Sequence, residues 1–202
     1  ESRNIKNKPY IISVCGLTLD DTLNILNNIF MSYKNLDYKI NGVEINLSCP
    51  NIIGKGQLGY DFTKMDQYLK TIFDLDIIEE LQDFTIGVKL PPYFDLHQFS
   101  EVTDILEKYD IDFVTCINSI GNGLIVDSEK EEILIKPKGG MGGIGGKYVK
   151  PTGLSNVRNF YLQFQKRNLK IDIIGCGGIE TGEDVFDYIL CGASLVQVGT
   201  QF

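Results

Sequence analysis

The sequence predicts an α/β fold in which helices cover a parallel sheet, either an open doubly wound sheet or an incomplete (β/α)8 TIM barrel. Short apolar segments alternate with longer segments in which apolar residues recur at helical spacing. The strand-like segments are largely apolar instead of alternating with polar residues, which is typical of parallel strands covered on both faces. Glycine and polar residues cluster where these strands end.

Six strands are expected along the chain, at about 9–14, 42–46, 84–90, 112–118, 171–175 and 195–199. Helices are expected between them, at about 20–30, 62–81, 95–106, 154–164 and 184–190. A β-hairpin is expected after the fourth strand, because the apolar segments Ile125-Val126 and Ile133-Leu134-Ile135 flank a charged turn there. With the glycine-rich loop that follows it, this insertion spans about 119–150.

The glycine turns after the last two strands favour the barrel. A complete barrel needs eight strands and about 250 residues, and such enzymes often bind phosphate after strands seven and eight. If Gly177-Gly178 and Gly199-Thr200 are those two turns, the six strands are numbers three to eight. The 202 residues then form one partial barrel domain, 1–202, without the two leading strands and the last helix.

Composition excludes several classes of function. The net charge is −8 and the 19 Lys and Arg are scattered, so nucleic acid is not an expected partner. No apolar run is long enough to cross a membrane. The five cysteines form neither a C-x-x-C pair nor a metal-like cluster, and with a single histidine no metal site is predicted. The start of the chain carries no secretory signal pattern.

The glycine turns have a plausible chemistry as a phosphate grip. Glycine lets the backbone come close to a ligand, and its N–H groups can point at an anion. Thr181-Gly182 opens a helix whose positive end is expected to face the same region. Tight turns without any ligand are the alternative. The G-x-G-x-x-G segment at 140–145 does not open a helix directly, since Pro151 delays it, and we interpret it as a flexible loop over a ligand.

Two reactive side chains stand near the same predicted edge. Cys49 precedes Pro50 in a loop, and a thiol can act as a base near neutral pH if its pKa is tuned. An inert loop cysteine is the alternative. Lys89 ends an apolar strand, where it can meet an anionic cofactor or a reduced ring, or else extend along the surface. His97 is interpreted as a surface residue.

Several long motifs resemble the cytosolic class 1A dihydroorotate dehydrogenases, in order and over nearly the whole chain. They are NLSCPN at 46–51, GKGQLGYDF at 54–62, GVKLPPYFD at 87–95, INSIGNGL at 117–124, IKPKGGMGGIGG at 135–146, KPTGLSNVR at 150–158, CGGIETGEDVF at 176–186 and LCGASLVQVGT at 190–200. The resemblance implies a (β/α)8 barrel that binds FMN and oxidises dihydroorotate to orotate in pyrimidine synthesis, with fumarate reduced to succinate. It also implies a cytoplasmic homodimer.

The resemblance implies a role for individual residues. Cys49 matches the catalytic base that removes the C5 proton while a hydride leaves C6. The substrate-binding positions are matched by Asn46, Asn51, Asn118 and Ser119. The FMN-binding positions are matched by Asn46, Lys89, Ile117, Gly146, Gly177, Gly178, Gly199 and Thr200.

Two other functions stay open. A related flavin barrel that acts on dihydropyrimidines also presents a cysteine after an Asn-Leu-Ser run, although PPYFD and NSIGNG favour dihydroorotate. A non-catalytic barrel fragment is the second alternative. Because the family's leading strands and closing helix lie outside this sequence, we expect the 202-residue chain alone to bind FMN poorly.

Overall fold

The computed structural model describes residues 8–32, 40–48, 56–81, 83–134 and 137–201. Six strands form one parallel sheet in chain order: β1 (Ile11–Val14), β2 (Gly42–Asn46), β3 (Thr85–Leu90), β4 (Phe113–Cys116), β9 (Asp172–Cys176) and β10 (Leu195–Gln197). Each strand pairs with the next, without the reversal that defines a doubly wound sheet. This order is consistent with an incomplete barrel, and the numbering of the strands as three to eight stays a prediction.

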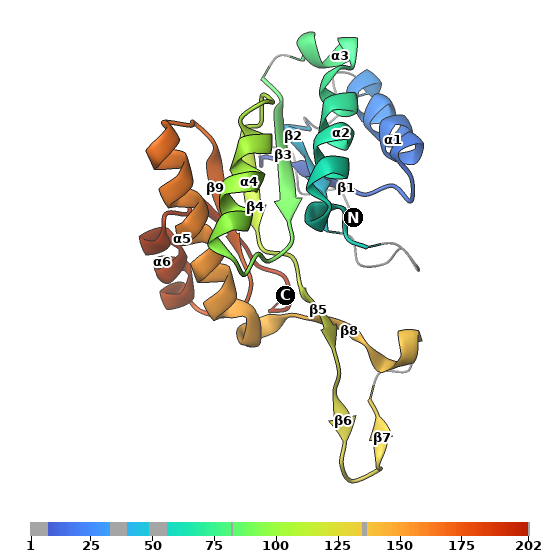
Figure 1. Cartoon of the computed structure of the whole chain (residues 1–202), viewed down its shortest axis with the longest axis vertical. Helices are drawn as coiled ribbons and strands as arrows, with labels where there is room; N and C mark the ends of the chain where they lie inside the picture. Colours follow the sequence, from blue (N-terminus) through green and yellow to red (C-terminus); the bar gives the residue numbers. More distant parts are fainter. Residues whose placement is uncertain (1–7, 33–39, 49–55, 82, 135–136, 202) are drawn as a thin grey trace.

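The helices lie side by side along one face of this sheet (Figure 1). They are α1 (Leu19–Ser32), α2 (Phe62–Phe73), α3 (Asp76–Glu79), α4 (Leu96–Leu106), α5 (Lys150–Arg167) and α6 (Gly182–Cys191). Short 3-10 turns add η1 (Leu58–Tyr60), η2 (Pro137–Gly140) and η3 (Gly146–Val149). Among the described helices, none has both the length and the apolar character that a membrane crossing requires.

Two predicted helix boundaries were wrong. The expected helix at 62–81 is interrupted, because Leu75 takes an extended conformation with ψ 121° and separates α2 from α3. Pro151 does not delay the fifth helix, which begins at Lys150. Proline is compatible with the first turn of a helix, where its missing N–H would have no intrahelical partner.

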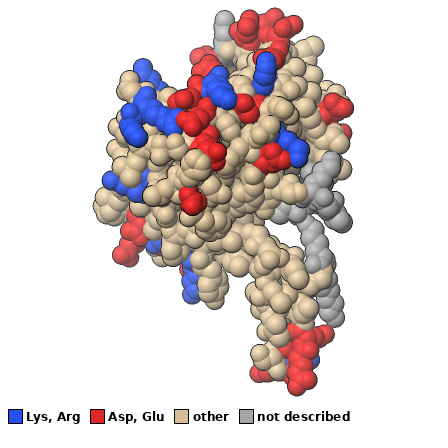
Figure 2. All heavy atoms as spheres, in the orientation of Figure 1, with Lys and Arg blue, Asp and Glu red and all other residues tan. Residues whose placement is uncertain are grey.

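The predicted insertion forms an arm that projects from the body below the sheet (Figure 1). Its tip is the expected hairpin, with β6 (Val126–Asp127) paired antiparallel to β7 (Glu132–Ile133). At its base, β5 (Ile120–Gly123) pairs antiparallel with β8 (Gly142–Ile144). Part of the predicted glycine loop is therefore a strand. Acidic side chains gather at the tip of the arm (Figure 2).

An aromatic cluster fills the layer between the sheet and the helices. Phe160 on α5 is fully buried and packs edge-on against Phe99 on α4 and Tyr93, with ring centroids 5.1 and 5.9 Å away. The Tyr93 hydroxyl donates to the Gly59 carbonyl at 2.8 Å, and burial raises the pKa of this phenol. The cluster therefore holds η1 and the segment after β3 against the helix layer.

The opposite face of the sheet is less apolar than the sequence pattern suggested. Glu44 on β2, Lys89 on β3 and Thr115 on β4 are all buried there, with 4%, 8% and 0% exposure. Strand pairing places Lys89 beside Thr115, while Glu44 lies two positions before Asn46, the partner of Lys89. Because side chains alternate along a strand, these residues share one face while Val43 and Ile45 face the helices.

Candidate active site

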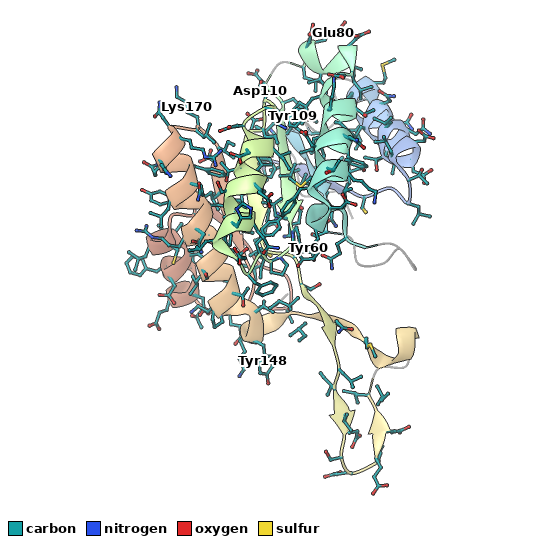
Figure 3. The ribbon with its side chains drawn as sticks, viewed as in Figure 1. Tyr60, Glu80, Tyr109, Asp110, Tyr148 and Lys170 are labelled. Carbon is teal, nitrogen blue, oxygen red and sulfur yellow. The ribbon has the colours of Figure 1, made fainter. Side chains whose placement is uncertain are left out.

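A cavity opens at the carboxyl end of the sheet. In Figure 3, the labelled residues Tyr60 and Tyr148 lie toward this end of the sheet. The labelled residues Glu80, Asp110 and Lys170 lie toward its amino end. The cavity is lined by residues from the ends of β3, β4, β9 and β10 and from the start of η3. Of the residues predicted for the site, nine line it: Lys89, Ile117, Asn118, Ser119, Gly146, Gly177, Gly178, Gly199 and Thr200.

Of the three remaining predicted residues, the structure describes Asn46. Asn46 lies next to the cavity, because the side-chain amide of Asn118 donates to the Asn46 Oδ1 at 3.3 Å. The same Asn46 oxygen accepts from the backbone N–H of Ser48 at 3.0 Å, so the end of β2 is tied to the end of β4. Cys49 and Asn51 lie outside the described residues.

The glycine turns around the cavity need glycine at specific positions. Gly146, Gly177 and Gly178 have positive φ angles of 68°, 128° and 66°, which other residues rarely adopt. A Cβ atom on Gly178 would also lie 2.8 Å from the Gly146 carbonyl oxygen. Gly199 differs, because a Cβ there would meet nothing within 4 Å. The backbone conformation therefore favours glycine at the first three positions. At Gly199 a side chain would instead meet open space.

Lys89 points into the barrel side of the sheet and not along the surface. Its ammonium donates to the Gln197 Oε1 at 2.7 Å, and both residues line the cavity. The Gln197 amide in turn donates to the Glu44 carboxylate at 2.9 Å. The alternative of a surface lysine is therefore wrong, and one cation stands at the floor of the cavity.

Sequence reasoning did not identify Glu44, Thr115 or Gln197. The Glu44 carboxylate accepts from the hydroxyls of Ser13 at 2.9 Å and Thr115 at 2.6 Å, besides the Gln197 amide. The sequence feature that could have identified Glu44 is its charge between two apolar residues, Val43 and Ile45. A charge in a buried strand is costly unless it is hydrogen-bonded, so its presence already indicated an internal polar site.

Comparison with known proteins identifies the family. The profile described as "Dihydroorotate dehydrogenase" matches residues 1–202. A "Dihydroorotate dehydrogenase (fumarate)" of Kluyveromyces lactis is 47% identical over 204 residues and covers 100% of this chain. A protein of the same name from Saccharomyces cerevisiae is 45% identical over 201 residues and covers 98% of it. This chain belongs to the dihydroorotate dehydrogenase family. It spans 59% of the length of each of these two relatives.

In this member of the dihydroorotate dehydrogenase family, Tyr188 of α6 packs against the strand end and turn that contain Gly175 and Gly177. Its fully buried ring packs where a Cβ on Gly175 would lie 2.3 Å away, and its hydroxyl donates to the Gly177 carbonyl at 2.7 Å. Burial raises the pKa of this phenol, so it stays a donor. Because the carbonyl and the next N–H point in opposite directions across a trans peptide, the Gly178 N–H points away from Tyr188.

A side-chain carboxylate of α6 itself, that of Asp184, already accepts hydrogen bonds at the N-terminal end of this helix. Asp184 accepts from the backbone N–H groups of Glu180 at 2.9 Å and Thr181 at 2.7 Å, and its other oxygen accepts from Lys150 at 2.5 Å. The Lys150 ammonium and these N–H groups hold the pKa of Asp184 well below its usual range. The expected use of this helix end for phosphate is therefore weakened, and the glycine turns are the better candidates.

Other ligand types find little support near the cavity. Within the described ranges, no group of three or more His, Cys, Asp and Glu could hold a metal ion. His97 is 79% exposed in its side chain and lies beside Glu101 on α4, as expected for a surface residue. Among the described residues that line it, the cavity offers the Lys89 cation, amide groups and a glycine-rich rim, which suits a planar polar ligand with a phosphate group.

Proposed function

We propose that the protein containing this chain oxidises dihydroorotate to orotate with FMN as cofactor, in pyrimidine synthesis, with fumarate as the electron acceptor. One observation carries the proposal: nine separately predicted site residues, from four strand ends and the η3 turn, line a single cavity. The names of the relatives support the substrate and the acceptor. A cytoplasmic location is part of the same proposal.

The cavity residues fit FMN at both of its ends. The turn of Gly177 and Gly178 approaches Gly146 so closely that a Cβ on Gly178 would lie 2.8 Å from the Gly146 carbonyl oxygen, and such a glycine-rich turn suits a phosphate group held by backbone N–H groups. Gly199 and Thr200 complete this rim. Lys89 stands on the floor, where an ammonium can face the ring system and balance negative charge on it. When bound, FMN supplies the acceptor for the hydride of the substrate.

The proposed substrate site lies beside this cavity. Asn46, Asn118 and Ser119 present donors and acceptors at the ends of β2 and β4, and we assign Asn51 to the same set. We assign Cys49 as the general base that takes the C5 proton of dihydroorotate. Because proton and hydride leave adjacent carbons, the base and the hydride acceptor must stand on opposite sides of the substrate.

The visible spectrum of the whole protein tests this proposal. Purified protein is titrated with FMN, and dihydroorotate is then added without oxygen. Bleaching of the flavin band, followed by recovery on adding fumarate, supports the proposal. Bleaching by dihydrouracil but not by dihydroorotate would assign the protein to the dihydropyrimidine enzymes. Failure to bind FMN at all would leave the non-catalytic alternative.

Replacement of the thiol tests the base. Cys49→Ala is expected to bind FMN normally and to lose turnover by about 100-fold or more, the usual contribution of a general base. Cys116→Ala is the matched control, since Cys116 is fully buried and burial raises the pKa of its thiol well above the ordinary value. Turnover of Cys49→Ala close to that of the control would remove Cys49 from the mechanism.

We also propose a homodimer, from the family resemblance. The arm exposes apolar side chains that an interface would cover, among them Leu124, Ile125 and Leu134, with 49%, 57% and 57% exposure. Sedimentation of the whole protein should give twice the mass of one chain. A Leu134→Asp variant that sediments identically would show that the arm is not the interface.

A further inference from the structure

A hydrogen-bonded polar network lies on the inner face of the sheet, from buried Glu44 through half-buried Gln197 to buried Lys89. The two hydrogen bonds that form it are 2.9 and 2.7 Å long. Glu44 and Lys89 are nearly inaccessible to solvent, with 4% and 8% exposure. Charges at this depth are tolerated only when neighbouring groups satisfy them, so each link of the network matters energetically.

The chemistry of the two ends dictates the orientation of the Gln197 amide. A carboxylate can only accept hydrogen bonds, and an ammonium can only donate them. The NH2 group of Gln197 must therefore face Glu44, and its carbonyl oxygen must face Lys89. In the reverse orientation the amide would present its NH2 group to the ammonium and its oxygen to the carboxylate, which repels both partners.

Gln197 also keeps two opposite charges apart. Glu44 and Lys89 lie on the same face of neighbouring strands, yet in the described residues each of them bonds to Gln197 and no ion pair joins the two. Instead the Lys89 ammonium is drawn toward a neutral oxygen at the cavity floor. Without the amide, Lys89 would share the inner face with Glu44, a buried carboxylate on the neighbouring strand that its flexible stem could approach.

We propose that Gln197 is a positioning residue that holds the Lys89 ammonium in the cavity and prevents it from pairing with Glu44. This inference rests on the proposed function, in which Lys89 faces the bound flavin. An ammonium held there stabilises the negative charge that the flavin gains on reduction. Gln197 thereby sets both the affinity for FMN and its midpoint potential, without contact with the substrate.

A double-mutant cycle on the whole protein tests the inference. Gln197→Met keeps the length of the side chain but removes the amide, so Lys89 is expected to move toward Glu44. The Kd for FMN should rise about tenfold, as expected for the loss of one charge-assisted hydrogen bond. The midpoint potential of the bound flavin should become more negative, because a cation has left its vicinity.

A double variant distinguishes whether Gln197 positions Lys89 or only fills space beside it. In the double variant Glu44→Gln/Gln197→Met no buried carboxylate remains to attract Lys89, so affinity and potential should recover most of the loss. Gln165→Met, exposed on α5, is the matched control and should leave both quantities unchanged. Equal values for the single and the double variant would overturn the inference.

Failure of the proposed function and failure of the positioning role give different results. If wild-type protein takes up no FMN, the proposed function fails, independently of any variant. If wild type binds FMN and folded Gln197→Met keeps its potential, only the positioning role fails. Should Gln197→Met not fold, Gln197→Asn keeps an amide that is one methylene too short to bond both partners. It is expected to shift the potential in the same direction, and an unchanged potential would count against the role.

Discussion

Both faces of the parallel sheet contain nearly inaccessible side chains, but the two faces differ in what holds those side chains together. On the face toward the helices, Val43, Val88 and Val114 are fully buried among apolar side chains. On the inner face, Glu44 and Thr115 are buried to the same degree but are joined by a 2.6 Å hydrogen bond. Burial alone therefore does not define a core: the helix face needs matched volumes, and the inner face needs matched donors and acceptors.

The largest expected effect lies on the helix face. Phe160→Ala should lower the free energy of unfolding by about 3–5 kcal/mol, because it leaves a cavity between Tyr93, Phe99 and Phe164. Denaturant unfolding measures it. Phe186→Ala, whose ring is 60% exposed on α6, is the control and should change little. A loss for Phe160→Ala as small as that of the control would show that the aromatic cluster is not a core.

A reciprocal pair of variants on β4 sharpens the comparison. Thr115→Val removes the donor to Glu44 and should cost about 1.5–3 kcal/mol, typical of a hydrogen bond to a charged group. Val114→Thr, one position away, buries a hydroxyl on the apolar face and should cost about 1–3 kcal/mol. Denaturant unfolding of both measures the difference. If either exchange is neutral, the assignment of that side chain to its face is wrong.

A smaller effect is expected at the glycine turn. Tyr188→Phe removes the hydrogen bond to the Gly177 carbonyl and should lower stability by about 1 kcal/mol. Because the Gly177–Gly178 peptide is then less constrained, the Kd for FMN should rise as well, which calorimetric titration measures. Tyr148→Phe, at a site with 78% exposure, is the control. An unchanged Kd for Tyr188→Phe would separate this peptide from phosphate binding.

The last expected effect, for Asp184→Asn, is a change in how stability depends on pH. The pKa of Asp184 is lowered in the folded chain, so its contribution to stability is complete above the ordinary carboxyl value of 3.8. It is lost as the pH falls below that value, because the unfolded chain then binds the proton more readily. Unfolding curves at decreasing pH should therefore be less steeply pH-dependent for Asp184→Asn than for wild type or Glu129→Gln. Identical slopes would contradict this.

Local patterns predicted much of this protein. The six strands, the hairpin tip and the glycine turns follow from short-range features: apolar runs, turn residues and glycine pairs. The helix around Pro151 was predicted less well, because the pattern marks a proline but not its position within the first turn. The break at Leu75 was also missed, although the flanking Asp74 and Asp76 are poor helix formers that favour caps.

The sequence by itself determined the order of the strands and helices, and it contained the glycine turns and Lys89 as candidates for a phosphate and cofactor site. Only the tertiary structure decided that Lys89 is linked to Glu44 through Gln197, residues separated by 108 and 153 positions in the chain. The physical reason is that β4 and β9 separate β3 from β10 in the sheet, so strand pairing alone does not make these residues neighbours. The sheet must curve for Gln197 to reach Lys89 and Glu44 across its inner face, and no local sequence pattern specifies that curvature.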